Sequence, residues 1–217
     1  EDFNFYEKIK VSAPTWCPQC RMLRRMNWQG YRILYKRKCD FTGDMLISTY
    51  HPDSPYKVYR QDIWWGDKWD PKSYGKDIDW NKPFLEQFKE LMLEVPHASL
   101  ATAHSTMIRS DYCNAASACK DCYLCFRITG GEDSAYLNTV VDGKQSLDCS
   151  FLNHSELCYG SINVNKCYQI FFSQNCVECQ TVWFSRDLVG CSDCVGCINL
   201  RMKKYCIFNK QYSKEEY

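Results

Sequence analysis

Two cysteines near the start of the chain, Cys17 and Cys20, have the spacing Cys-x-x-Cys. Thiolates at this spacing clamp one face of a tetrahedral zinc ion, and a structural site needs two more ligands. Cys39 and His51 are the nearest residues that could supply them. The sequence therefore predicts a Zn²⁺ site formed by Cys17, Cys20, Cys39 and His51, with a metal-free pair of thiols as the alternative.

The second half of the chain carries two Cys-x-x-Cys-x-x-Cys triplets. Such triplets ligate iron–sulfur clusters in bacterial ferredoxins, but neither triplet here is followed by the Cys-Pro that completes that motif. We expect these thiols to be inert core residues, with an iron–sulfur or redox protein, or disulfides, as the alternatives. The alternative cluster ligands are Cys119, Cys122, Cys125, Cys191, Cys194 and Cys197.

Cysteine also recurs every nine residues, at Cys149, Cys158, Cys167 and Cys176. A fixed short period is typical of a solenoid, in which each coil buries its face against the next. Short apolar runs separated by Asn, Asp, Ser and Gly indicate strands and turns rather than helices. We expect a parallel β-solenoid (β-helix) over residues 98–217, with coils of about 18 residues and cysteines facing a narrow core.

Positive charge is concentrated at the N-terminal end. The net charge is only +1, yet residues 1–40 carry nine Lys or Arg against four Asp or Glu. Trp28, Tyr31 and Tyr35 are interleaved with these charges, and basic residues with aromatics can hold phosphates and stack bases. The alternative is a solvated basic face. The candidate nucleic-acid-binding residues are Arg21, Arg24, Arg25, Lys36, Arg37 and Lys38.

Residues 61–97 form a connector rich in tryptophan and aspartate. Asp77 and Asp79 could hold a divalent metal in a hydrolase, although we expect the tryptophans to pack and the acids to be solvated. An amphipathic pattern begins at Pro83 and is stopped by Pro96, which predicts a helix over residues 83–94. Its apolar stripe is expected to cap the end of the solenoid.

The composition is that of a globular protein, with 45% hydrophobic and 24% charged residues, and excludes general disorder. Cys-x-x-Cys spacing favours a reduced, cytoplasmic protein, and no apolar run is long enough to cross a membrane. The predicted fold is mainly β in three parts. These are a basic zinc-ribbon-like module (residues 1–60, with a hairpin between 45–50 and 56–59), the connector (61–97) and the solenoid (98–217).

Several longer motifs are similar to those of an uncharacterised cysteine-rich bacterial family with an N-terminal zinc ribbon and a C-terminal cysteine repeat. The motifs are Phe5-Tyr6-Glu7-Lys8-Ile9, Cys17-Pro18-x-Cys20-Arg21, Leu34-Tyr35-Lys36-Arg37-Lys38-Cys39-Asp40, Trp64-Trp65-x-Asp67-Lys68-Trp69-Asp70 and Gly190-Cys191-x-x-Cys194-x-Gly196-Cys197. The resemblance covers nearly the whole chain.

This resemblance implies that a further Cys-x-x-Cys, upstream of residue 1, completes the site of Cys17 and Cys20. It also implies a second ribbon in some relatives at the positions of Cys39, Thr42, Arg60 and Ile63, three of which are not cysteine in this chain. No established activity comes with the family.

The sequence thus favours a non-enzymatic zinc-binding scaffold or binding protein. Its basic N-terminal module would contact nucleic acid or a nucleoprotein, with a protein or nucleic acid as partner and no membrane. The alternatives are an iron–sulfur or redox protein and a metal-dependent hydrolase using Asp77 and Asp79. Nothing in the sequence indicates an oligomeric state.

Overall fold

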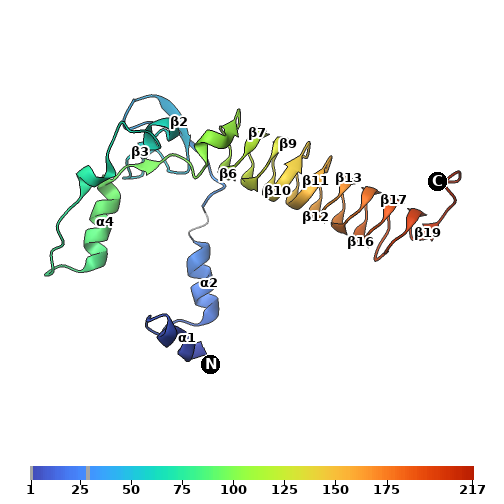
Figure 1. Ribbon diagram of the computed structural model, residues 1–217, viewed down its shortest axis with the longest axis horizontal. Helices are drawn as coiled ribbons and strands as arrows, with labels where there is room; N and C mark the ends of the chain where they lie inside the picture. The colour runs from blue at the N-terminus through green and yellow to red at the C-terminus, as the bar shows by residue number, and fades with distance from the viewer. Residues whose placement is uncertain (1, 28–29) are drawn as a thin grey trace.

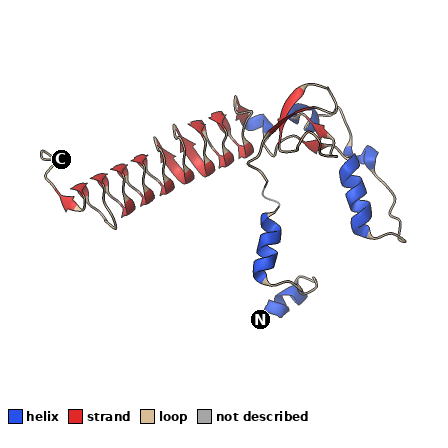
Figure 2. Ribbon diagram, turned by 180° about the vertical axis from the view of Figure 1, so that it is seen from behind, coloured by secondary structure: helices blue, strands red, loops and turns tan. Residues whose placement is uncertain are grey.

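The computed structural model describes residues 2–27 and 30–217, and its two halves differ in architecture (Figure 1). The helices gather in the N-terminal half, whereas the C-terminal half is a long stack of short strands (Figure 2). The elements of the N-terminal half are α1 (Asp2–Lys8), α2 (Pro18–Met26), β1 (Tyr35–Lys38), β2 (Met45–Ser48), β3 (Val58–Tyr59), α3 (Gln61–Trp64), η1 (Pro71–Tyr74), α4 (Phe84–Glu94), β4 (His97–Ala98) and η2 (His104–Thr106).

The C-terminal half is a parallel β-solenoid of about eight turns between residues 107 and 207, as the sequence predicts. Its strands are β5 (Met107–Ile108), β6 (Asn114–Ser117), β7 (Cys119–Tyr123), β8 (Phe126–Thr129), β9 (Glu132–Ala135), β10 (Asn138–Lys144), β11 (Ser150–Glu156), β12 (Ile162–Asn165), β13 (Tyr168–Phe171), β14 (Gln174–Val177), β15 (Gln180–Trp183), β16 (Arg186–Val189), β17 (Ser192–Val195), β18 (Lys204–Ile207) and β19 (Lys210–Gln211). Only β19 runs antiparallel to its neighbour among these paired strands.

The coil is shorter than predicted. Val140 pairs with Leu152, Leu152 with Val164, and Val164 with Cys176, so each coil contains 12 residues. The prediction of 18-residue coils is therefore wrong. Every cysteine from Cys113 to Cys206 is separated from the next by a multiple of three, and the nine-residue step is three-quarters of a coil rather than half of one.

A three-residue unit generates this coil. The first residue of each unit points inward and is buried, and the third takes a left-handed backbone conformation, as at Glu178 (φ 53°), Thr181 (φ 52°) and Phe184 (φ 50°). Left-handed backbone turns the chain sharply, at a cost of roughly 1–2 kcal/mol for a residue with a side chain. Four such units bring the chain round once and place four inward side chains in every coil.

Small polar side chains bind the inner wall of the coil to its neighbours. The buried Ser146 hydroxyl donates to the carbonyl oxygen of Lys144 (2.8 Å) and accepts from the backbone N–H of Cys158, one coil later (3.1 Å). Ser173 and Ser185 repeat the arrangement. Inward cysteines likewise donate from Sγ to the carbonyl two residues earlier, as Cys149 does to Leu147 (3.2 Å). Cysteine and serine therefore fit this core both in volume and in hydrogen bonding.

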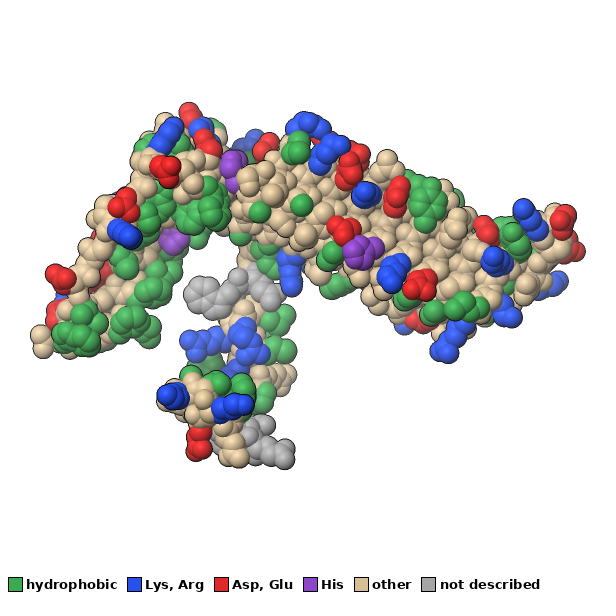
Figure 3. Space-filling view, viewed as in Figure 1, with side chains coloured by type: hydrophobic (Ala, Val, Ile, Leu, Met, Phe, Trp, Pro, Cys, Tyr) green, Lys and Arg blue, Asp and Glu red, His purple; other side chains and the backbone are tan. Residues whose placement is uncertain are grey.

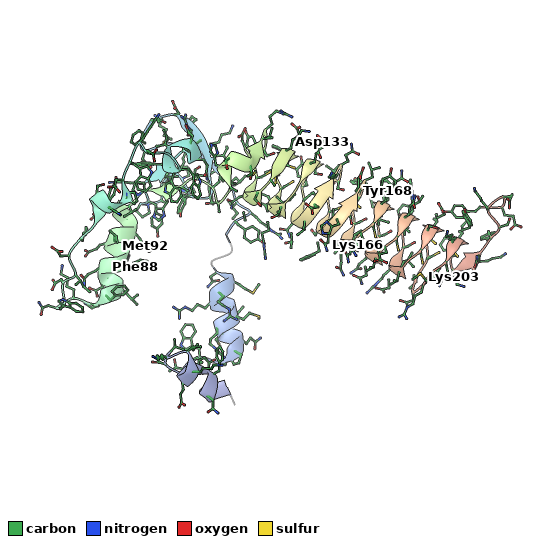
Figure 4. All side chains as sticks on the ribbon, viewed as in Figure 1. Phe88, Met92, Asp133, Lys166, Tyr168 and Lys203 are labelled. Carbon is green, nitrogen blue, oxygen red and sulfur yellow. The ribbon has the colours of Figure 1, made fainter. Side chains whose placement is uncertain are left out.

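The helix predicted over residues 83–94 is present as α4, but it does not cap the solenoid. None of its residues is buried, and Phe84 and Leu85 are 65% and 74% exposed. Phe88 and Met92 lie on α4, apart from the solenoid strands (Figure 4). The first coils are instead joined to the segment before them, since the Ala101 N–H donates to Asn114 Oδ1 (2.7 Å).

The predicted N-terminal hairpin exists with different partners. β1 and β2 pair antiparallel around the turn at residues 39–44, whereas β3 pairs in parallel with β4 from the far end of the connector. The turn at residues 51–55 therefore joins two separate sheets. The prediction erred because the partner of β3 lies 39 residues further along the chain, beyond the reach of a local turn signal.

Removal of one inward hydroxyl tests this account of the core. We expect Ser146→Ala to lower the free energy of unfolding by about 1–3 kcal/mol, because the buried N–H of Cys158 loses its acceptor. Ser150→Ala is the matched control, since Ser150 lies only four residues further along and is not one of the buried inward residues. Denaturant unfolding followed by circular dichroism measures both variants, and equal stability of the two would contradict the role of the inward hydroxyl.

Candidate functional site

Cys17 and Cys20 are exposed at the start of α2. Cys17 caps the helix, and its Sγ accepts from the backbone N–H of Cys20 (3.3 Å). This hydrogen bond lowers the pKa of Cys17, and the neighbouring charge of Arg21 acts in the same direction. The hydrogen bond with the Cys17 thiol raises the pKa of Cys20. The pair therefore contains one thiol that ionises more readily than the other.

The other two predicted zinc ligands lie elsewhere. Cys39 is buried with Leu46 and Val58 beneath the β1–β2 hairpin, where its Sγ accepts from the N–H of Arg60 (3.3 Å). The His51 ring packs edge-on against Tyr35, and its Nδ1 accepts from the N–H of Asp53. Within residues 2–27 and 30–217, no three His, Cys, Asp or Glu side chains are grouped to hold a metal ion. The predicted four-ligand site is not assembled.

The two cysteine triplets line the solenoid core. All six of their cysteines are at most 3% exposed, and each donates from Sγ to the carbonyl two residues earlier. Hydrogen bonds of its thiol with the thiols of Cys119 and Cys125 lower the pKa of Cys122. In the second triplet, burial raises the pKa of Cys194 to about 12. Neither triplet forms a metal-holding group in the described chain, as an iron–sulfur cluster would require.

The basic residues fall into two groups. Arg37 is buried, and its guanidinium donates to Asp40 (3.0 Å), Ser54 (3.1 Å) and two backbone carbonyls. These bonds hold the loop after β2 against β1, and they leave little of the Arg37 side chain exposed to a phosphate. The other predicted nucleic-acid-binding residues are accessible to solvent. Arg24, Arg25, Lys36 and Lys38 are exposed, and Arg21 is half-buried.

The exposed arginines are carried by α2, which lies apart from the β1–β2 hairpin (Figure 1). Arg21 Nη1 donates to the Tyr6 hydroxyl of α1 (2.8 Å), which ties the two helices together. The Arg24 guanidinium lies 5.6 Å from the ring centroid of Trp16, itself 55% exposed. Together, α1, α2 and the turn between them form a basic N-terminal arm. Trp28 lies outside the described residues.

The solenoid carries charge differently. Most of its ion pairs join residues one coil apart, as in Lys120–Glu132 (2.9 Å) and Lys166–Glu178 (3.7 Å), and His154 Nδ1 likewise lies 2.9 Å from an Asp142 carboxylate oxygen. Charged side chains of both signs consequently alternate along the solenoid face turned to the viewer in Figure 3. A face of balanced charge does not attract phosphate strongly. Attraction of nucleic acid would therefore fall to the N-terminal arm.

Trp64 and Trp69 of the connector are structural, whereas Trp80 is 85% exposed. The Trp64 indole donates to the carbonyl of Pro96 (3.0 Å), and the Trp69 indole donates to the carbonyl of Trp64 (2.9 Å). Asp77 and Asp79 lie in an exposed loop, and the Gln87 side chain of α4 bonds to the backbone of Asp79. Neither aspartate side chain is buried.

Sequence reasoning missed a cleft of about 610 Å³ where the β1–β2 hairpin meets the first coil of the solenoid. Leu46 and Ile47 line it from β2, and Leu100, Met107 and Tyr112 line it from the other side. At its edge, Arg60 is already paired with Asp44 (2.9 Å) and Asp62 (2.5 Å). No short motif marks this cleft, because its walls come from segments more than fifty residues apart.

No helix in the described part of the chain combines the length and apolar character needed to cross a membrane. The chain matches no model of a known protein family, and it matches no curated protein.

Thiol labelling tests the contrast between the arm and the core. All 16 cysteines are free, but only Cys17 and Cys20 are exposed. We expect a native sample to alkylate at these two residues, with Cys17 faster because its pKa is lowered. The remaining 14 should react only after unfolding in guanidinium. Peptide mass spectrometry measures each site, and fast native labelling of Cys149 or Cys158 would contradict a closed core.

Proposed function

We propose that this chain is a non-enzymatic binding scaffold whose basic N-terminal arm contacts nucleic-acid phosphates. The observation that carries the proposal is the exposure of α2, which has no buried residue and bears Arg24 and Arg25 in its last turn. The solenoid provides a rigid rod, since each coil is hydrogen-bonded to the next along its length.

The charge distribution and the aromatic residues support this proposal. Residues 1–40 carry nine Lys or Arg against four Asp or Glu, whereas the rest of the chain is net negative, and five of those nine basic residues lie in the arm. The balanced ion pairs of the solenoid leave the arm as the main site for phosphate. The exposed Trp16 ring beside Arg24 offers a surface on which a base can stack. Single-stranded nucleic acid is the partner that uses both features.

The proposal predicts a salt-dependent affinity that depends on α2. We expect Arg24→Glu/Arg25→Glu to weaken binding of a fluorescent single-stranded oligonucleotide at least tenfold at low salt, as measured by anisotropy. Loss of two phosphate contacts should also reduce the slope of log K against log salt by about 1.4.

Lys203→Glu/Lys204→Glu is the matched control, because it reverses two exposed charges at the far end of the solenoid. It should leave the affinity within about twofold, as expected for charges that touch no phosphate. Equal losses in the two double variants would show that only net charge matters and would overturn the assignment to α2.

We further propose that Cys17 and Cys20 form one half of a zinc site in this arm. Their spacing, their exposure and the lowered pKa of Cys17 all support metal binding by thiolates. A structural zinc ion is four-coordinate, so two more ligands would come from another polypeptide segment. Cys39 would not contribute, since it is buried beneath the β1–β2 hairpin. Sixteen free thiols also support the expectation of a reducing, cytoplasmic setting.

Metal analysis and labelling test this site together. We expect zinc bound to the purified protein to be lost in Cys17→Ser/Cys20→Ser and kept in Cys39→Ser, as measured by elemental mass spectrometry. Zinc should protect Cys17 and Cys20 from alkylation, and a chelator should restore their reactivity. Zinc retained by the double variant would place the metal elsewhere and refute this assignment.

A further inference from the structure

One side of the solenoid carries a continuous column of apolar side chains. Tyr123, Ala135, Leu147, Tyr159, Phe171, Trp183, Val195 and Ile207 occupy successive coils and pair in register, each with the next. A second column beside it holds the left-handed residue that follows each of these. Its large members are Leu124, Tyr136, Phe172, Phe184 and Phe208. Tyr112 lies one coil before Leu124 and extends this column, although its own backbone is not left-handed. We call these two columns the aromatic face.

The rings of the aromatic face contact one another along the rod. Ring centroids lie 5.3 Å apart in Tyr112–Tyr123, 4.7 Å in Phe171–Trp183 and 5.2 Å in the stacked pair Phe172–Phe184. The rings therefore support one another and form a preorganised surface rather than isolated side chains. Within the fully described stretch from residue 112 to 208, these two columns contain one charged side chain, that of Asp148.

The exposed area is close to what a stable protein contact requires. Eight large side chains of the face between Tyr112 and Phe184 are 37–59% exposed. At roughly 200 Å² for each side chain, they present about 700 Å² of apolar surface. A standard specific interface covers about 800 Å² on each partner, and a contiguous apolar patch of this size is unusual on a monomer.

We propose that the aromatic face is a homodimer interface, in which a second copy of this chain packs antiparallel across a two-fold axis at Tyr159. The proposal does not depend on nucleic-acid or zinc binding. Nucleic acid is a poor occupant of this face, because its one charge is the carboxylate of Asp148, which repels phosphate. The outer faces with ion pairs stay in water.

The distribution of large and small side chains sets the register. Ala135 and Trp183 lie equally far along the column on either side of Tyr159, as do Leu147 and Phe171. A shallow apolar hollow of about 260 Å³ adjoins Leu147 and Tyr159. A two-fold axis at Tyr159 therefore places the bulky Trp183 of each copy opposite the small Ala135 of the other. Because strands in both copies repeat at ~4.8 Å, contacts made at one coil recur at the next.

Molar mass in solution tests the interface directly. Light scattering on the eluting intact chain should give twice the chain mass of 25.6 kDa. We expect Trp183→Asp to raise the dimer dissociation constant by about tenfold or more, as for an interface hot spot. Phe151→Asp is the matched control, because Phe151 is 53% exposed on a different side of the coil and should leave the dimer intact.

A charge pair tests the proposed register. Ala135→Arg alone should also dissociate the dimer, whereas Ala135→Arg/Trp183→Asp should restore it, because each arginine would face an aspartate of the other copy. Circular dichroism confirms that every variant is folded, and Phe172→Asp serves as an independent variant if Trp183→Asp is not. A monomeric wild type, or a dimer insensitive to both aspartate substitutions on the face, would overturn the proposal. A dimer disrupted by both but not rescued would overturn the axis at Tyr159.

Discussion

The narrow core of the solenoid is the constraint on which the rest of the structure depends. A coil of 12 residues leaves space for four inward side chains, and these must also bond to the backbone close beside them. Leucine, isoleucine and valine fill one column of the core, whereas serine, cysteine and glycine dominate the others. At the inward Gly131, even a β-carbon would come within 2.5 Å of Ile128, so volume is limiting at that position. Cysteine is frequent because it is small, apolar and able to donate a weak hydrogen bond.

The same three-residue unit imposes a cost that the stacking must offset. Residues with side chains, including the β-branched Thr139 and Thr181, adopt left-handed backbone throughout the coils. A single coil could not sustain this strain, because its backbone groups would be bonded only to water. In the stack, the left-handed residue itself donates to the previous coil, as Glu178 does to Asn165 (2.9 Å). The residues with strained left-handed backbone are thus the same residues that hydrogen-bond neighbouring coils together. Each coil therefore stabilises the next, and folding is cooperative along the rod.

The sequence allowed the solenoid, its parallel pairing and the inward cysteines to be predicted, because a repeat places equivalent residues in equivalent positions. The sequence pattern led to the wrong coil length. A nine-residue step fits half of an 18-residue coil, but it fits three units of three residues equally well. The steps of three at Cys119, Cys122 and Cys125 were the signal for the shorter unit, but the same spacing suggests metal ligands. The four predicted zinc ligands are not brought together, for a different reason. Cys39 lies close to Cys17 in sequence, yet folding of the hairpin buries its sulfur beside Leu46 and Val58. Arg37 likewise belongs to a basic run in sequence but to a buried hydrogen-bond network in space.

The 12-residue repeat also divides the surface of the solenoid into parallel stripes, each of which can have a different function. Because each outward position stacks on its equivalent one coil later, a residue type kept at one position becomes a continuous stripe along the rod. Ion pairs such as Lys120–Glu132 form one stripe, and the rings around Tyr159 form another. A change at a single coil interrupts a stripe without disturbing the core, since inward and outward residues alternate in fixed order. The surface of the rod can therefore be adapted to a partner while the cysteine and serine core remains the same. The N-terminal arm, which lies outside the repeat, is free of this constraint and can bear a local cluster of positive charge.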